Sequence, residues 1–277
     1  MMESVKLMLK GGVIGVANII PGVSGGTMAV VMGIYERLIH AIGNVATDAE
    51  RRMEYIRFLG VVGIGAVLAV FLLSGVMDYL LTYHKVYTHL FFIGLVGGSI
   101  PAIYQTHSDM RVSAPAVLSL VAGVAVLLGF SIGFGHVEKP EVVAGGGVNL
   151  DAARLGLLLL SGFLAGGSMI VPGISGSLML LLMGQYAAVI KAIRTLDVVV
   201  LGVVAIGAVL GVVGFARLID ALLKRFPKET FYFILGLVVA SLYPIFPGLP
   251  ETLVQGLIGL LLVMLGGAIS FRLGQRG

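Results

Sequence analysis

Charged residues are scarce in this chain. They make up 12% of its 277 residues, roughly half the share that soluble domains carry. Cysteine is absent, which excludes disulfides, thiolate nucleophiles and cysteine-ligated metal sites. Tryptophan is absent as well, so an aromatic belt at a membrane interface would have to come from the nine tyrosines. The low charge argues against a water-soluble globular domain.

The chain is rich in long apolar segments. Hydrophobic residues make up 58% of it and the mean hydropathy is +1.07. The runs 59–73 and 198–214 have no water-facing stripe and are typical of membrane spans. The 41 glycines suit helices that pack closely in lipid. The net charge of +4 fits the cytoplasmic loops of a membrane protein and does not indicate a nucleic-acid partner.

The two halves of the chain resemble each other around a repeated turn. Gly-Val-Ala-Asn-Ile-Ile-Pro-Gly-Val-Ser-Gly-Gly-Thr-Met at 15–28 matches Gly-Gly-Ser-Met-Ile-Val-Pro-Gly-Ile-Ser-Gly-Ser-Leu-Met at 166–179. Pro21 aligns with Pro172, an offset of 151 (172 − 21). The ordered recurrence of proline, serine and glycine indicates an internal repeat rather than chance similarity between apolar helices.

A second stretch extends this repeat. Leu-Gly-Val-Val-Gly-Ile-Gly-Ala-Val-Leu at 59–68 matches Leu-Gly-Val-Val-Ala-Ile-Gly-Ala-Val-Leu at 201–210, an offset of 142 (201 − 59). The same offset aligns Asp78 with Asp220. The change of offset falls in the polar loop 48–57, where insertions are tolerated. We therefore assign about 1–144 to a first repeat and 145–277 to a second, within a single membrane domain.

Each half contains five apolar pieces, so an odd number of crossings would invert the second half relative to the first. The pieces run approximately 5–20, 26–42, 57–82, 88–104 and 113–134, and then 154–171, 177–193, 198–223, 230–246 and 252–271. We assume that the N-terminus is cytoplasmic and that the first two pieces of each half enter and leave the membrane on the same side. Thirteen of the 18 Lys and Arg residues then fall on the cytoplasmic side. This charge distribution favours an all-α polytopic membrane protein with two inverted-topology repeats.

A Pro-Gly-(Val/Ile)-Ser-Gly turn separates the first two pieces of each half. Each flanking arm has about 16 residues, roughly 24 Å of helix against a hydrocarbon core of about 30 Å. We therefore predict re-entrant helical hairpins at about 5–42 and 154–193, each followed by about three transmembrane helices, at 57–134 and 198–271. Two full crossings would give the same loop charges, so that alternative stays open.

The chemistry of such a turn suits an anion. Proline ends the incoming helix, glycine leaves the backbone bare, and Ser24 or Ser175 can cap the outgoing helix. The outgoing helix then directs free N–H groups and its positive dipole end at the tip, as phosphate requires. A plain tight turn in a helix bundle is the alternative. The recurrence of the turn in both halves, with polar residues nearby, favours a secondary-transporter site at the membrane midplane.

These motifs resemble those of the bacterial polyprenyl-phosphate transporter family of the PopT type, formerly a domain-of-unknown-function membrane family. The matching segments are Ile-Pro-Gly-Val-Ser-Gly-Gly-Thr at 20–27 with Gly-Ile-Tyr-Glu-Arg-Leu at 33–38, and Val-Pro-Gly-Ile-Ser-Gly-Ser at 171–177 with Gly-Gln-Tyr at 184–186. The resemblance implies a flippase in the bacterial cytoplasmic membrane. Its substrate would be undecaprenyl phosphate, which is recycled for cell-wall biogenesis.

The resemblance also implies a binding site at the two turns, with the polyprenyl tail leaving through a lateral opening between the halves. The residues carried over are Pro21, Gly22, Ser24, Gly25, Gly26, Thr27, Arg37, Pro172, Gly173, Ser175, Gly176 and Ser177. Arg37 has no counterpart, because Ala188 aligns with it. It is either a charge partner of the phosphate or a snorkelling residue paired with Glu36.

Three acidic residues are candidates for proton or Na⁺ coupling: Glu36, Asp78 and Asp220. The alternative for Asp220 is a helix-end acid paired with a neighbouring base such as Lys224. The five histidines are scattered without metal-ligand spacing, so we predict no metal site and no cofactor. The sequence leaves the coupling ion, the transport direction and the oligomeric state open.

Two other functions are associated with a similar turn or binding centre. The undecaprenyl pyrophosphate phosphatases look similar, but their turn continues with arginine where Gly25 and Gly176 stand, and they carry an acidic cluster that the hairpins here lack. Phosphoester hydrolysis needs such a charged stabiliser and acid–base pair, so we predict no enzyme activity. A secondary transporter of a small organic anion would share the same binding centre and stays open.

Overall fold

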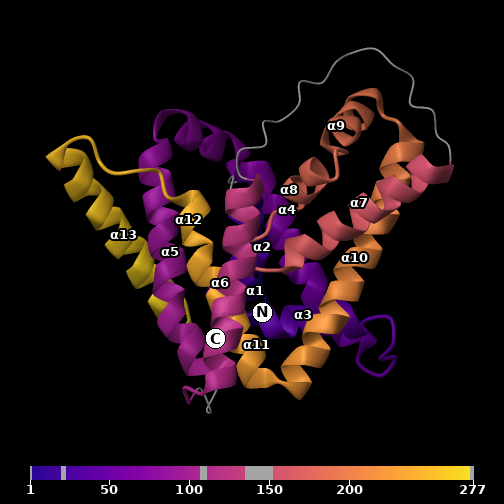
Figure 1. The fold of residues 1–277 in the computed structure, drawn as a ribbon, viewed down its shortest axis with the longest axis horizontal. Coiled ribbons are helices and arrows are strands. Elements are labelled where there is room, and N and C mark those ends of the chain that lie inside the picture. Colours follow the sequence, from indigo (N-terminus) through magenta and orange to yellow (C-terminus); the bar gives the residue numbers. More distant parts are fainter. Residues whose placement is uncertain (1, 20–22, 107–110, 135–151, 275–277) are drawn as a thin grey trace.

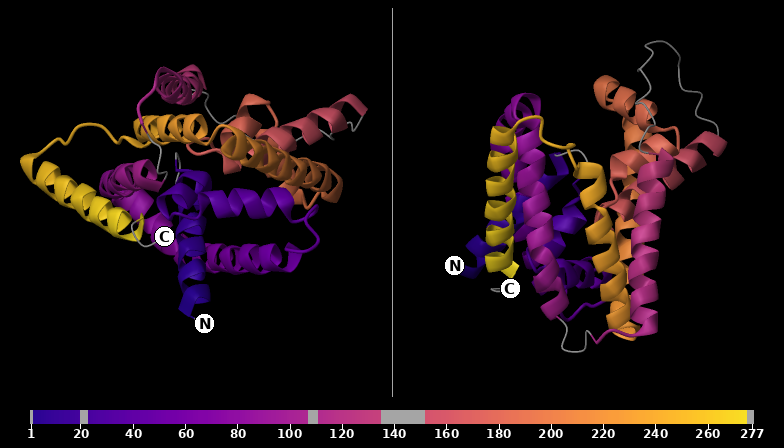
Figure 2. Two further views of the ribbon diagram at one scale, coloured as in Figure 1. Left: turned by 90° about the horizontal axis from the view of Figure 1, so that it is seen from below. Right: turned by 60° about the vertical axis from the view of Figure 1, so that its left-hand side comes forward.

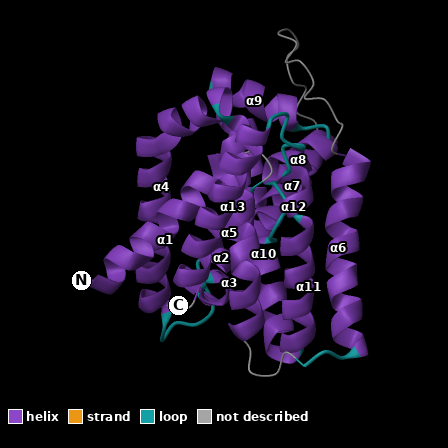
Figure 3. Cartoon of the chain, turned by 90° about the vertical axis from the view of Figure 1, so that its left-hand side faces the viewer, coloured by secondary structure: helices purple, strands orange, loops and turns teal. Residues whose placement is uncertain are grey.

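The computed structural model describes residues 2–19, 23–106, 111–134 and 152–274, and helices are the regular elements found among them (Figure 3). The helices are α1 (Met2–Ile19), α2 (Gly25–Val31), α3 (Tyr35–Asn44), α4 (Arg52–Tyr83), α5 (Lys85–Thr106), α6 (Ala114–Phe134), α7 (Ala152–Ile170), α8 (Gly176–Leu182), α9 (Tyr186–Thr195), α10 (Val198–Arg225), α11 (Pro227–Ala240), α12 (Leu242–Ile245) and α13 (Leu253–Gly274).

Several helices are built to lie in lipid. By length and composition, five stretches of the described chain can cross a membrane, or six if the broken pair α8–α9 counts as one span. The five are Arg52–Tyr83, Ala152–Ile170, Val198–Arg225, Pro227–Ile245 and Leu253–Arg272. Large apolar side chains such as Phe71 and Leu72 lie exposed on α4, where hydrocarbon rather than water is the compatible solvent. The chain is therefore a multi-pass membrane protein.

The outgoing arm of each hairpin is two helices, not the single helix predicted for 26–42 and 177–193. In the first half α2 ends before α3 begins, and in the second half α8 and α9 are bent by 111°. At the two breaks Gly33 and Gly184 have φ of +66° and +67°, a conformation that L side chains rarely adopt. These glycines end the short helices after two turns and redirect the chain.

Both halves pack their incoming arm against their first long helix in the same way. A Cβ built on Gly11 of α1 would lie 2.2 Å from the carbonyl oxygen of Val62 on α4. A Cβ on Gly162 of α7 would lie 2.3 Å from that of Val204 on α10. The offsets of 151 and 142 relate these pairs. Glycine therefore allows the backbones of α1–α4 and α7–α10 to approach closely, as in other membrane helix pairs.

The remaining long helices are interleaved between the halves. Figure 2 shows α13 beside α5, and α6 beside α11. The contacts again correspond: a Cβ on Gly94 would lie 2.2 Å from the carbonyl oxygen of Val263, and one on Gly236 would lie 2.2 Å from that of Leu120. Each half thus supplies a helix that completes a pair in the other half.

The two hairpins approach the middle of the molecule from different sides. In Figure 1, α7 descends from the upper right to the centre and α9 lies near the top, whereas α3 and the loop before α4 lie in the lower half. The end of α7 and the start of α2 therefore come together inside the helix bundle.

Candidate functional site

The tips of the two hairpins touch. The backbone N–H of Gly173 donates to the hydroxyl oxygen of Ser24 at 2.9 Å and to that of Thr27 at 2.8 Å. Both hydroxyl-bearing side chains are buried, with 4% and 2% of their surface exposed. Two turns that lie 149 residues apart in the sequence are thus joined by direct hydrogen bonds.

Ser24 also caps α2, as the sequence predicted. Its Oγ accepts a hydrogen bond from the Thr27 N–H at 3.1 Å, and the two hydroxyl oxygens lie 2.9 Å apart. Asn18 of α1 accepts from the Gly25 N–H at 3.1 Å. The described polar groups of the first tip are therefore used in holding its own turn and the second tip.

The second tip keeps its polar groups more accessible. Ser175 stands at the N-cap of α8, but no side-chain hydrogen bond caps this helix. The Ser175 Oγ lies 2.8 Å from the Ser177 Oγ, and Ser177 is exposed. Gly173, with φ of +82°, turns the chain between α7 and these serines. The uncapped first turn of α8 and its two hydroxyls are the polar surface that a ligand could reach.

Glycine is required where the tips meet. A Cβ built on Gly26 would lie 2.4 Å from the Ile170 carbonyl oxygen and 3.3 Å from the nitrogen of Pro172. Pro172 itself is buried. At Gly176 a Cβ would lie 2.9 Å from the Ala165 carbonyl oxygen, so the start of α8 also needs glycine, although the approach there is less close.

The other predicted tip residues are only partly described. Gly25 lies buried at the start of α2. Pro21 and Gly22 fall outside the described residues, so no contact of theirs is reported.

Arg37 lies away from the tips. It is exposed on α3, and its guanidinium carbon stands 4.4 Å from the centre of the Phe58 ring, a cation–π arrangement. It lines a small crevice of about 310 Å³ with the acidic Glu3 and Glu54 and the basic Arg57. Glu36, its neighbour, is also exposed. The structure therefore puts this charge at the rim of the first hairpin.

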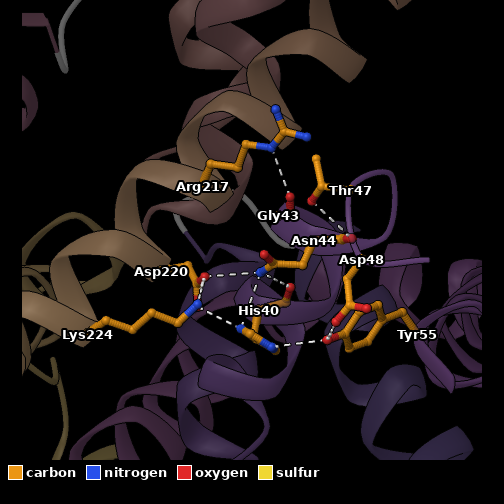
Figure 4. A network of polar contacts seen from close by, with 9 residues as sticks. All are labelled: His40, Gly43, Asn44, Thr47, Asp48, Tyr55, Arg217, Asp220 and Lys224. Atoms are coloured by element: carbon orange, nitrogen blue, oxygen red, sulfur yellow. Dashed lines mark hydrogen bonds and ion pairs between the residues drawn. The ribbon is translucent and has the colours of Figure 1, made fainter. Parts of the chain in front are cut away.

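Asp220 lies in a polar network between α3 and α10 (Figure 4). Its carboxylate accepts hydrogen bonds from Lys224 at 2.6 Å and Asn44 at 3.0 Å, and lies 2.9 Å from Nδ1 of His40. The predicted partnership with Lys224 is thus present, but His40 and Asn44 were missed. Asp78 is exposed on α4. Clusters of acidic and histidine side chains able to hold a metal do not occur among the described residues.

A large apolar cavity runs between α1, α4, α5 and α13. Its volume is about 870 Å³. Val16 of α1 and Met32 at the end of α2 line it, as do His84 and Tyr87 beside the α4–α5 connection. Leu72 lines it too and is exposed, so the cavity opens on the lipid-facing surface. It provides a hydrocarbon-lined space beside the first hairpin.

Comparisons with known proteins agree on one family. The profile of a family described as undecaprenyl phosphate translocase-like matches residues 14–255. The chain is similar to the polyprenyl-phosphate transporter of Staphylococcus aureus, with 31% identity over 97% of this chain and 95% of that protein. It is similar to the polyprenyl-phosphate transporter of Vibrio cholerae, with 30% identity over 89% of this chain and 79% of that protein. Both relatives are named as transporters, not as enzymes. No solved structure matches the chain.

Proposed function

The chain belongs to the undecaprenyl phosphate translocase-like family, and from this premise we propose that it is a flippase that moves undecaprenyl phosphate across the bacterial cytoplasmic membrane. One observation carries the proposal beyond the family. Two broken hairpins from different halves meet at Gly173, Ser24 and Thr27, beside an apolar cavity that opens toward lipid. A substrate with an anionic head and a long apolar tail fits both features.

The phosphate is proposed to bind at the second tip. Ser175 and Ser177 are accessible hydroxyl donors, and the first-turn N–H groups of α8 carry no side-chain cap. Because α8 has only seven residues, we attribute binding to these local donors rather than to a helix dipole. Ser24, Gly26 and Thr27 would keep the tips together. The predicted Pro21, Gly22, Gly25, Pro172, Gly173 and Gly176 complete the proposed site as turn residues.

The rim charges have separate proposed roles. Arg37 is exposed on α3 and would meet the headgroup at the membrane surface rather than at the tip. A guanidinium binds phosphate well. Glu36 and Asp78 are exposed acids and are the candidates for proton or Na⁺ coupling, since Asp220 is already engaged by His40 and Lys224.

The isoprenoid tail is proposed to occupy the apolar cavity. Burying hydrocarbon there costs little, because the lining is apolar and the alternative is the surrounding lipid. Val16 and Met32 bring the cavity to the first hairpin, so head and tail can be held at the same time. The headgroup could then cross the bilayer while the tail stays in an apolar environment.

Inverted repeats are part of this proposal. The corresponding helices α5 and α11 run in opposite directions in Figure 1, and the hairpins approach from opposite sides. Together with the excess of Lys and Arg in loops assigned to the inside, this supports a cytoplasmic N-terminus. Such a pair of repeats around a midplane site is the usual basis of alternating access.

The test is a flip assay on purified protein in liposomes that carry fluorescent polyprenyl phosphate in both leaflets. Active protein should expose the inner-leaflet lipid to an external membrane-impermeant quencher faster than protein-free liposomes do. Equal rates would overturn the proposal. Release of free phosphate from polyprenyl pyrophosphate would favour the phosphatase instead, and uptake of a water-soluble organic anion without lipid movement would favour the anion carrier.

A further inference from the structure

The contact between α3 and α10 is a closed latch between the two halves. Besides the pair of His40 and Asp220, Nε of Arg217 donates to the Gly43 carbonyl oxygen at 2.9 Å. A Cβ on Gly43 would lie 3.3 Å from the backbone nitrogen of Arg217, so the two helices approach closely at this glycine. We call these four residues the α3–α10 latch.

The latch is well hydrogen-bonded. Tyr55 donates its hydroxyl proton to Asp48 at 3.0 Å, and its oxygen lies 3.2 Å from Nε2 of His40. Nδ1 of the same ring lies 2.9 Å from Asp220. His40 therefore bridges α10 to α4 through its two ring nitrogens, so the latch is held by hydrogen bonds as well as by packing.

The internal repeat contains a second copy of these residues. The offset of 151 takes His40 to Lys191 and Gly43 to Arg194, both on α9. The offset of 142 takes Asp220 back to Asp78, and Arg217 back to Gly75, both on α4.

The second copy preserves the complementarity. A base on the short helix again corresponds to an acid on the long helix. The arginine and the glycine have exchanged helices, so each copy pairs one Arg with one Gly. Both members of each set are three residues apart and share a helix face. Each copy therefore supplies the same kinds of partner for one helix–helix contact: a base with an acid, and an arginine with a glycine.

In this structure the second copy is open. Among the described residues α4 and α9 do not pack against each other as α3 and α10 do, and Figure 1 shows α9 apart from the end of α4. A Cβ on Gly75 would meet no described atom within 4 Å. Asp78 is exposed and, within the described part of the chain, forms no hydrogen bond or ion pair. A lone carboxylate on a membrane-spanning helix is costly.

We propose that the Gly75–Asp78 face of α4 is a docking surface for α9 of the same chain. In a second conformation Lys191 pairs with Asp78, and Arg194 reaches the backbone at Gly75, while the α3–α10 latch opens. The inference rests on the proposed transport function. The two contacts are the closures that alternate during transport, one on each side of the membrane. Exchange of one closure for the other lets each side open without leaving both open together.

Cysteine cross-linking tests the docking surface, and the chain contains no native cysteine. In the otherwise intact protein, a short bifunctional thiol reagent should join Asp78→Cys to Lys191→Cys, and should also join His40→Cys to Asp220→Cys. The matched control pairs Asp78→Cys with Ile193→Cys, which lies on another face of α9 and is 53% exposed; it should remain unjoined. Joining of the control as readily as of the Lys191 pair would overturn the specific contact.

Two readouts separate this inference from the proposed function. Either cross-link should stop lipid flipping, and cleaving the reagent should return the rate to that of the same cysteine pair before cross-linking. Asp78→Lys should slow flipping about tenfold, equivalent to about 1.4 kcal/mol, and adding Lys191→Asp should recover most of the rate. Absent cross-linking at Asp78 and Lys191 in a protein that flips lipid would refute the docking surface alone. Absent flipping by the unmodified protein, with both cross-links formed, would refute the proposed function alone.

Discussion

Ser24 accepts a hydrogen bond of 2.9 Å from the backbone N–H of Gly173, which belongs to the other half of the chain. Thr27 accepts from the same N–H, so two hydroxyls of the first turn hold one amide of the second. The junction is not symmetric, because Leu178 stands where the repeat would place the counterpart of Thr27. The first turn therefore acts as the anchor, and the second turn is left with accessible donors.

Removing both hydroxyls of the anchor should destabilise the protein. The double change Ser24→Ala with Thr27→Val leaves the Gly173 N–H without its acceptors, at a cost of about 1–3 kcal/mol. The expected result is a lower thermal unfolding temperature in detergent micelles. Ser74→Ala, which alters an exposed hydroxyl of α4, is the control. Equal unfolding temperatures for the double variant and the parent would contradict the role given to the anchor.

Adding one methyl group at the junction should separate the tips. Gly26→Ala forces a Cβ to within 2.4 Å of the Ile170 carbonyl oxygen, and overpacking of this kind costs about 1–3 kcal/mol. Unfolding temperature and flipping rate should both fall. Gly202→Ala on α10, where a Cβ would meet no atom of the described residues within 4 Å, should leave both near the parent values. A junction that tolerates alanine would show that the tips do not need this approach.

The serines of the second tip should matter for transport and not for stability. Ser175→Ala with Ser177→Ala removes two accessible donors from the proposed phosphate site. Because hydrogen bonds to charged groups contribute about 1.5–3 kcal/mol, the flipping rate at low lipid content should drop at least about tenfold. The unfolding temperature in the absence of lipid should stay within a degree or two of the parent. An unchanged flipping rate would move the headgroup site elsewhere.

Narrowing the apolar cavity should discriminate between substrates by tail length. Val16→Phe replaces a small side chain that lines the cavity beside the first hairpin with a phenyl ring. Flipping of a long polyprenyl phosphate should slow more than flipping of a two-isoprene analogue, because only the long tail needs the volume that the Phe ring occupies. Val254→Phe on α13, at an exposed position, is the control. Equal slowing of both lipids would argue against a tail site in this cavity.

Acid should weaken the loop between α3 and α4. The pKa of Asp48 is lowered, first by the hydrogen bond from the Arg51 backbone N–H and then by the Tyr55 hydroxyl. A depressed folded-state pKa stabilises the fold above the unfolded value of about 3.9, and this stabilisation is lost as the pH falls through the folded-state pKa. Asp48→Asn should therefore unfold earlier than the parent at neutral pH, and the gap should close below about pH 4. A gap that stays constant with pH would exclude the carboxylate as its cause.

The sequence predicted the local parts of this fold well. The piece predicted at 113–134 is α6 (Ala114–Phe134), and 198–223 is the larger part of α10 (Val198–Arg225). Such agreement is expected, because an unbroken apolar run has few alternatives to a helix in lipid. The capping role of Ser24 followed from its place after a turn and before an apolar segment.

The breaks and the long-range contacts could not be predicted in the same way. Gly33 was one of 41 glycines, and nothing local marks which glycine adopts a positive φ. The distance of Arg37 from the tips depends on the bend after α2. The sequence analysis gives His40 no role beyond that of one of five scattered histidines, although its alignment with Lys191 is a usable signal. A base that recurs opposite a recurring acid can be found from the repeat alone.

The interleaving of α5 with α13 has a consequence for biogenesis. During synthesis α5 enters the bilayer long before α13 exists, so its glycine-lined face at Gly94 must wait in lipid for a partner encoded about 170 residues later. Neither half can complete all of its helix pairs alone, and a ribosome that stalls after the first repeat leaves an unfinished protein rather than half of a working one. The pairing of α13 with α5 is the last one that synthesis makes possible, after that of α11 with α6.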